Sequence, residues 1–268
     1  NDLRRAIERN EFFLHYQPIV DLETGCTVSL ETLIRWQHPE RGLVPPGDFI
    51  PLSEETGLII QIGEWVLRTV CAQLKAWRED GLTSVRVAVN VSGRQLKLPD
   101  FPTLVKNVLE SYDLPPDLLE FEITESVLME NLEHANRILD ELTGLGIRLS
   151  LDDFGTGYSS LSYLHQFPVH RLKIDRSFII KIGQSNENTQ IVQAILNMAS
   201  GLGLDVVAEG VETAQAASRL RAMGCAFAQG YYFASPGDAA EITPLLPRPE
   251  PAPAERTISG MLPRAQVR

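Results

Sequence analysis

The stretch Leu149-Ser-Leu-Asp-Asp-Phe-Gly-Thr-Gly-Tyr158 joins an apolar run to two adjacent carboxylates and then to glycines. Apolar residues bounded by glycine predict a buried strand, with Asp152 and Asp153 at its C-terminal end. Two neighbouring acids repel each other, and a divalent cation between them removes that repulsion. Gly155 and Gly157 allow backbone angles that other residues avoid, and they let a ligand approach closely.

Strands and helices alternate along the rest of the chain. Short apolar runs predict strands at 12–16, 27–36, 85–91, 118–123, 147–151, 171–174, 205–208 and 226–227. Helical spacing predicts helices at 2–9, 59–79, 104–112, 132–145, 159–165, 189–202, 212–223 and 238–246, with a loop at 47–51. This alternation is typical of α/β proteins with parallel strands and crossover helices. The count favours a TIM-like (β/α)8 barrel, and an open doubly wound sheet is the alternative.

Length and composition indicate one folded unit. The 268 residues are 44% hydrophobic, which is enough to bury one large core. We expect a single domain over residues 1–246. Residues 247–268 are rich in proline and have no apolar period, so we expect a flexible tail.

The charge balance limits the classes of partner. The chain has 24 Lys and Arg against 35 Asp and Glu, a net charge of −11. This balance disfavours binding to a DNA or RNA duplex or to an anionic membrane surface. A phosphate-bearing substrate would need metals and a few placed cations to offset the negative field.

The cysteines indicate a reducing compartment. Cys26, Cys71 and Cys225 lie far apart without C-x-x-C spacing, and no secretory leader precedes them, so we expect a cytoplasmic location. No apolar run approaches the roughly 18 residues that a membrane helix needs. Because the chain opens directly on a helical pattern, we also expect that it comes from a larger protein, with a sensory or membrane-anchored part upstream.

Polar residues recur at the strand ends, where barrel enzymes hold their active sites. They are Glu31, Asn90, Glu122, Asp152, Asp153, Lys173, Glu209 and Gln229, with Glu212 close behind. A single such acid is more often a helix cap or a surface group. Several acids buried together without counter-charge would cost several kcal/mol each, so their joint placement indicates a binding site.

The donor atoms are those of hard cations. Carboxylate and amide oxygens suit Mg²⁺ or Mn²⁺, and the five histidines lack the H-E-x-x-H spacing of a zinc site. A carboxylate such as Asp152 can bridge two ions ~3.5–4 Å apart, as in sites that attack phosphate esters in line.

The chain resembles the EAL-domain phosphodiesterases, which linearise the bacterial second messenger cyclic di-GMP. The resemblance covers roughly residues 1 to 246. Its motifs are Tyr16-Gln-Pro-Ile, Glu31-Thr-Leu-Ile-Arg-Trp36, Asn90-Val-Ser92, Glu122-Ile-Thr-Glu125, Asp152-Asp-Phe-Gly-Thr-Gly-Tyr-Ser-Ser160, Lys173-Ile-Asp175, Glu209-Gly-Val-Glu212 and Gln229-Gly-Tyr231.

The resemblance implies a barrel whose first strand is antiparallel to the others. It implies one metal ion on Glu31, Asn90, Glu122 and Asp152, and a second on Asp152, Asp153 and Glu209. It places Lys173 beside the attacking water, with Glu209 or Glu212 assisting, although a metal ion can activate water without a side-chain base. It also implies that the loop 155–160 couples dimer contacts, expected in a homodimer, to metal occupancy. The upstream part would then be a sensory or GGDEF-type domain.

Other side chains suit the nucleotide, and each has an ordinary structural alternative. Arg35 offers a planar fork for a phosphate, or a salt bridge to a helix. Leu33 and Pro51 suit the face of a guanine, or the core. Gln17, like the rim amide Gln229, suits a nucleotide edge or phosphate, or caps a strand.

One motif departs from the family pattern, because Glu-Ala-Leu is here Glu31-Thr32-Leu33. Strand alternation directs Thr32 toward the helices, away from Glu31, so we expect a mild effect on rate. Complete metal ligation favours a phosphodiesterase that produces linear pGpG over a module that only binds cyclic di-GMP. An aldolase-like role for Lys173 would need a lowered pKa, which the surrounding carboxylates oppose.

Overall fold

The computed structural model describes residues 2–129, 131–155, 164–182 and 186–248. Within them the strands form one closed sheet of the order β1-β9-β8-β7-β6-β5-β4-β2, which β1 closes by pairing with β2. The ring consists of β1 (Phe12–Asp21), β2 (Thr27–His38), β4 (Val87–Asn90), β5 (Leu119–Thr124), β6 (Arg148–Phe154), β7 (Arg171–Ile174), β8 (Asp205–Ala208) and β9 (Phe227–Ala228). The predicted barrel is confirmed.

The first strand is antiparallel to both of its neighbours. β1 pairs in this way with β2 and with β9, whereas the pairs from β2 round to β9 are parallel. The resemblance implied this direction, and the structure confirms it. A short strand, β3 (Gly42–Val44), forms a hairpin on β2 outside the ring.

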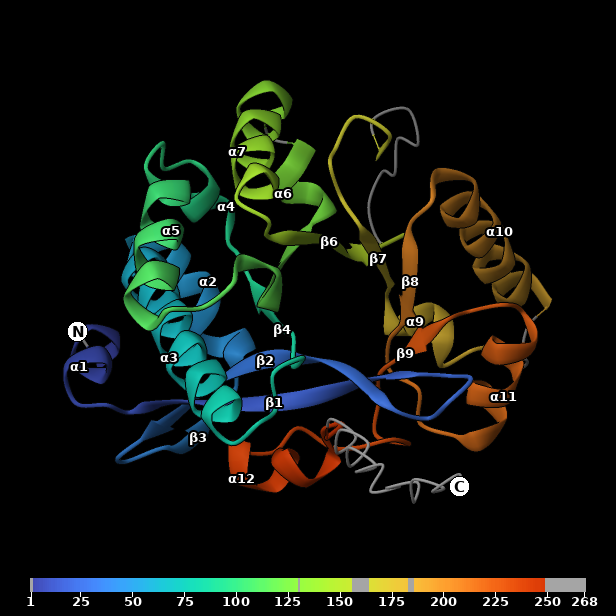
Figure 1. The fold of residues 1–268 in the computed structure, drawn as a ribbon, viewed down its shortest axis with the longest axis horizontal. Coiled ribbons are helices and arrows are strands. Elements are labelled where there is room, and N and C mark those ends of the chain that lie inside the picture. The colour runs from blue at the N-terminus through green and yellow to red at the C-terminus, as the bar shows by residue number, and fades with distance from the viewer. Residues whose placement is uncertain (1, 130, 156–163, 183–185, 249–268) are drawn as a thin grey trace, which may run out of the picture.

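Helices surround the ring of strands (Figure 1). They are α1 (Asp2–Glu8), α2 (Pro46–Thr56), α3 (Ile59–Glu79), α4 (Gly93–Leu96), α5 (Phe101–Tyr112), α6 (Glu125–Met129), α7 (Leu132–Gly144), α9 (Arg176–Ile179), α10 (Asn186–Leu202), α11 (Ala214–Ala222) and α12 (Ala239–Ile242). In α3, Ile62, Val66, Val70, Leu74 and Trp77 are buried at the spacing of one helix face. None of the described helices is long and apolar enough to span a bilayer.

The barrel has two separate interiors. The main apolar cluster lies between the strands and the helices. Ile19, Ala88 and Val207 are also fully buried but do not belong to that cluster. Because successive strand residues point to opposite faces, these three project into the lumen of the ring. The lumen therefore holds a second, smaller core. The polar strand-end residues lie above it, at the C-terminal ends of the parallel strands.

Local predictions differ from the structure in several places. Residues 47–51, predicted as a loop, lie inside α2. Pro46 occupies the first helical turn, where proline is tolerated. Pro51 lies in the helix interior, where the helix forms despite the loss of one backbone hydrogen bond. β6 continues through Asp153 to Phe154, since pairing with β7 extends beyond the apolar run. The hairpin strand β3 was not predicted. The predicted helix at 159–165 and the tail 247–268 lie mainly outside the described residues.

Gly230, which follows β9, tests how closely this part of the chain packs against the backbone of Val211. A Cβ built on Gly230 would lie 2.2 Å from the carbonyl oxygen of Val211 and 2.3 Å from its nitrogen, and φ is +156°. We expect Gly230→Ala to lower the free energy of unfolding by about 1–3 kcal/mol, measured by urea denaturation. Gly201→Ala in α10, where a Cβ meets nothing within 4 Å, is the matched control and should stabilise by about 0.5–1 kcal/mol. Equal effects of the two variants would contradict the packing argument.

Candidate active site

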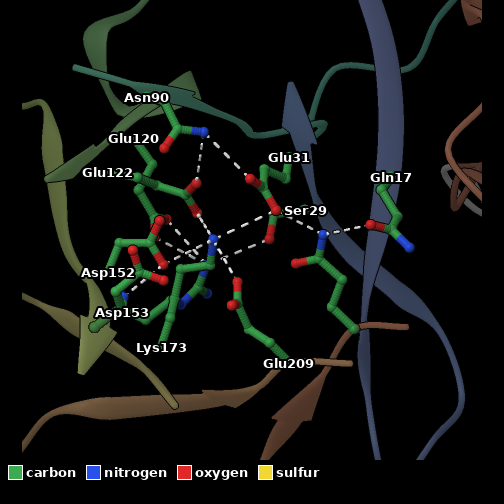
Figure 2. A network of polar contacts seen from close by, with 12 residues as sticks. Gln17, Ser29, Glu31, Asn90, Glu120, Glu122, Asp152, Asp153, Lys173 and Glu209 are labelled. Carbon is green, nitrogen blue, oxygen red and sulfur yellow. Dashed lines mark hydrogen bonds and ion pairs between the residues drawn. The ribbon is translucent and has the colours of Figure 1, made fainter. Parts of the chain in front are cut away.

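A buried lysine lies at the centre of the acidic residues (Figure 2). Lys173 Nζ, on β7, is 3.3 Å from Glu31, 2.9 Å from Glu122, 3.4 Å from Asp152 and 2.7 Å from Glu209. The side chain of Lys173 is 1% exposed. One ammonium thus faces four carboxylates, and an excess of negative charge remains.

Parallel strands explain why these side chains meet. Glu31, Glu122 and Asp152 lie on β2, β5 and β6, and Glu209 directly follows β8. Because the C-terminal ends of parallel strands meet at one edge, residues distant in sequence converge there. The structure therefore brings together the acids that the strand-end pattern selected.

Three carboxylates form a smaller group of their own. Asp152, Asp153 and Glu209 each offer an oxygen, and these atoms lie within 4.8 Å of one another. Asp153 has the left-handed φ of 55°, which a non-glycine residue adopts at some cost in energy. Its backbone N–H donates to Asp152 Oδ1 at 2.9 Å. This backbone turn brings the side chains of two successive strand residues to the same rim.

Side-chain amides connect the acids to the first strand. Gln229 Nε2 donates to Glu31 Oε2 at 2.6 Å and to Gln17 Oε1 at 2.9 Å, and Gln17 Nε2 donates to the carbonyl of Ala234 at 3.1 Å. The Asn90 amide nitrogen donates to Glu31 at 3.2 Å and to Glu122 at 3.4 Å. These bonds fix the orientation of the Glu31 carboxylate.

Burial and charge shift the pKa values of the acids in different directions. Burial, with the nearby negative charge of Glu31, raises the pKa of Glu122 well above its usual range. Burial also raises the pKa of Glu209 to about 8. For Glu31, burial is outweighed by Lys173 and by hydrogen bonds from Gln229 and Asn90, so its pKa is lowered. The site without cations thus retains protons at neutral pH.

The surrounding carboxylates and burial also shift the pKa values of Lys173 and Asp153. Burial opposes the charge on Lys173, but the surrounding carboxylates outweigh it and raise its pKa well above the ordinary value. This shift is opposite to the one that a Schiff-base lysine needs. Burial and the charge of Asp152 raise the pKa of Asp153.

The donor set fits divalent cations. Glu122 Oε1 is buried and accepts no hydrogen bond among the described residues, and Lys173 Nζ lies 2.9 Å from it as an ion-pair partner. The oxygens of Asp152, Asp153 and Glu209 are close enough to share one ion. A half-turn of the Asn90 amide would present its oxygen to the same space. Because the ligands are oxygen atoms, Mg²⁺ or Mn²⁺ suits the site better than zinc.

Two cavities adjoin these residues. One, of about 220 Å³, is lined by Gln17, Glu31, Asp152, Glu209, Glu212 and Gln229. Arg176 and Tyr231 line it too, and sequence reasoning gave neither a role, although both stand inside or next to quoted motifs. Their side chains add a cation and an aromatic ring to an otherwise acidic and amide-rich wall.

The second cavity, of about 310 Å³, lies between β2 and α3. Leu33, Arg35 and Asn90 line it, and Pro51 does not. Thr32 faces this cavity together with Ile62 of α3, as alternation predicts, and its buried hydroxyl has no hydrogen-bond partner among the described residues. Most of the loop 155–160 lies outside the described residues.

Comparison with known proteins gives the family. The EAL domain family matches residues 1–236. The chain belongs to the EAL domain family. Among curated relatives, the signaling protein YkoW of Bacillus subtilis is 49% identical over 234 residues, covering 87% of this chain and 29% of YkoW. The cyclic di-GMP phosphodiesterase NbdA of Pseudomonas aeruginosa is 45% identical over 235 residues, covering 88% and 30%.

A solved structure agrees with the family assignment. The structure described as the PaMucR phosphodiesterase in complex with c-di-GMP has a TM-score of 0.87 and 43% identity, and it covers 90% of this EAL domain and 98% of its own chain. The curated Pseudomonas aeruginosa MucR is named as both a diguanylate cyclase and a cyclic di-GMP phosphodiesterase, and the match covers 35% of it. The EAL domain thus spans about a third of the curated relatives it matches.

The raised pKa of Glu209 gives a testable pH dependence. In the folded domain without cations this carboxyl keeps its proton up to about pH 8, whereas its ordinary value is 4.5. The contribution of Glu209 to the free energy of unfolding is fully present below its ordinary pKa of 4.5, and it is lost as the pH rises through the folded-state pKa of about 8. In EDTA, we expect the Tm to fall less between pH 5 and 8.5 in Glu209→Gln than in the unchanged domain. Glu40→Gln, at an exposed position, is the control. The same fall in all three proteins would contradict the assignment.

Proposed function

We propose that this EAL domain is a metal-dependent phosphodiesterase that hydrolyses cyclic di-GMP to linear pGpG. The observation that carries the proposal is the convergence of Glu31, Glu122, Asp152 and Glu209 around buried Lys173 at one mouth of the barrel. The names of NbdA and MucR as cyclic di-GMP phosphodiesterases support the substrate.

Two divalent ions, Mg²⁺ or Mn²⁺, are proposed for the carboxylates. Glu31, Asn90, Glu122 and Asp152 would hold one ion, and Asp152, Asp153 and Glu209 the other. The grouping of the last three within 4.8 Å supports the second set. When bound, such ions polarise the phosphate oxygens and lower the pKa of a water.

The residues of the chain position water and move protons. Lys173 would orient the attacking water and balance part of the charge of the acids around it. Glu209, whose pKa is raised to about 8 by burial, is suited to accept a proton near neutral pH. Glu212 lines the same cavity and is the second candidate for that role.

Substrate binding is proposed for side chains on both sides of the acids. Gln17 and Gln229 lie on the cavity of about 220 Å³ and would bond a phosphate or a nucleotide edge. Arg35 and Leu33 lie on the other cavity, where a guanidinium suits a phosphate and an apolar side chain suits a guanine face. Pro51 keeps its predicted role at the guanine, although it lies on the exposed side of α2.

The relatives are roughly three times longer than the match, and MucR is named as bifunctional. We propose that the domain acts as a homodimer and receives its regulation from an upstream sensory or GGDEF-type domain.

Product analysis tests the proposed reaction. The domain is incubated with cyclic di-GMP and Mg²⁺, with and without EDTA, and the products are separated by chromatography. We expect a pGpG peak that EDTA abolishes, and a much smaller one when Ca²⁺ replaces Mg²⁺, because the looser coordination of Ca²⁺ holds water and phosphate less well in line. Tight binding of cyclic di-GMP without a new peak would instead identify a receptor.

Substitutions test the ligand assignment. Glu31→Ala and Asp153→Asn each remove a proposed metal ligand, so we expect hydrolysis to fall below detection in the same assay. Thr32→Ala should keep the rate within a small factor, because Thr32 faces α3 and not the acids. Unimpaired turnover by Asp153→Asn would show that the two-metal assignment is wrong.

A further inference from the structure

A second polar layer lies inside the barrel, next to the proposed active site and toward the N-terminal ends of the parallel strands. Side chains two residues apart on a strand point the same way. On β2, β5, β6 and β7 the site residues are Glu31, Glu122, Asp152 and Lys173, and the residues two positions earlier are Ser29, Glu120, Ser150 and Arg171. All of these earlier residues are buried. Four strands thus carry one polar side chain in each layer.

An ion pair crosses the lumen in this lower layer. Arg171 Nη1 donates to the two carboxylate oxygens of Glu120 at 3.1 and 3.0 Å, and to Ser29 Oγ at 3.3 Å. β7 and β5 are not neighbours, because β6 lies between them. The pair therefore connects strands that the sheet does not pair, and the contact with Ser29 extends the connection to β2. Figure 2 draws Glu120 and Ser29 together with the acids of the upper layer.

The surroundings hold this pair in one place. Side-chain exposure is 2% for Arg171 and 0% for Glu120. The Arg171 guanidinium lies 5.2 Å from the centre of the Phe227 ring, which contributes a cation–π contact from β9. Arg148 lies 4.0 Å from Glu120 and is also paired with Asp205 at 3.2 Å. The side chains therefore have little room for another arrangement.

Stability alone does not account for charges at this depth. A buried ion pair loses so much hydration that apolar residues of similar volume are often as stable or more stable. Arg171 Nε and Ser150 Oγ, in the same layer, are buried without a hydrogen-bond partner among the described residues, which adds to the cost. The ion pair fixes the direction and distance between β5 and β7, because its hydrogen bonds are directional. Apolar side chains would not impose this geometry.

The pair connects β5 and β7, and these two strands also carry Glu122 and Lys173. Of the carboxylates that lie on strands, Glu122 is the one nearest to Lys173 Nζ. Glu122 is two residues beyond Glu120, Lys173 is two residues beyond Arg171, and Lys173 Nζ lies 2.9 Å from Glu122. We propose that Glu120 and Arg171 are positioning residues: their ion pair holds β5 and β7 in place so that Glu122 and Lys173 meet the cations and the water in productive geometry. This role rests on the proposed phosphodiesterase function.

The double variant Glu120→Met/Arg171→Met tests the role, because it removes both charges and leaves none unpaired. We expect a folded protein with a Tm close to that of the unchanged domain. Its kcat should fall about 10- to 100-fold, the usual effect of losing a partner behind a metal ligand, and its affinity for Mn²⁺, measured by titration calorimetry, should fall with it. Its KM should change less than about twofold, because the proposed nucleotide contacts lie on other strands.

Glu23→Gln/Arg221→Gln is the matched control, since this ion pair, at 2.7 Å, is exposed and joins the turn after β1 to α11. It should leave kcat and Mn²⁺ affinity unchanged. A folded Met double variant with unchanged kcat and Mn²⁺ affinity would overturn the proposal. If that variant does not fold, Glu120→Gln, which keeps the volume and one acceptor, is measured in the same way. If neither folds, the pair is needed for stability, and the positioning role is wrong.

The calorimetry separates this inference from the proposed function. If the unchanged domain binds Mn²⁺ but does not hydrolyse cyclic di-GMP, the proposed function fails. The Mn²⁺ affinities of the double variant and the control still decide the role of the pair.

Discussion

The attraction between one buried ammonium and the carboxylates around it is the interaction on which the rest of the site depends. Lys173 lies within 3.4 Å of four acids that would otherwise repel one another inside the barrel. Even so, burial keeps the pKa values of Glu122 and Glu209 raised, which shows that one positive charge is insufficient. The fold thus assembles a place where further positive charge would stabilise the folded state, and the proposed use of divalent cations is consistent with the same imbalance.

Strand geometry gives this charge cluster its location and its support. Because side chains two residues apart on a strand point the same way, the lumen is divided into the layer of the proposed active site and a second layer that contains the ion pair of Glu120 and Arg171. Apolar side chains of Ile19, Ala88 and Val207 occupy the lumen on other strands. The lower layer is therefore polar on β2, β5, β6 and β7 and apolar on β1, β4 and β8, although the last three strands also carry or directly precede the site residues Gln17, Asn90 and Glu209.

Much of this arrangement could be predicted from the sequence, because it depends on local patterns. The bounds of α3 and β8 agree with the prediction, and the strand-end acids converge as expected. Other features depend on which strands meet. Neither periodicity nor spacing could show that β1 is antiparallel, or that Arg171 reaches Glu120, 51 residues away, across the lumen. Pro46 and Pro51, at the start and in the middle of α2, also concealed a helix, because proline favours loops and turns by its local preference.

The direction of β1 decides which end of the strand lies near the acidic cluster. Because β1 is opposed to its neighbours, its first residue, Phe12, pairs with Trp36, beyond Glu31 toward the catalytic mouth. In an all-parallel barrel the first strand would begin at the far end. Here the strand segment from Phe12 to Gln17 connects the end that follows α1 to Gln229, whose amide donates to both Gln17 and the Glu31 carboxylate. The N-terminal end of this domain is therefore linked to the acidic cluster by one strand segment and two hydrogen bonds.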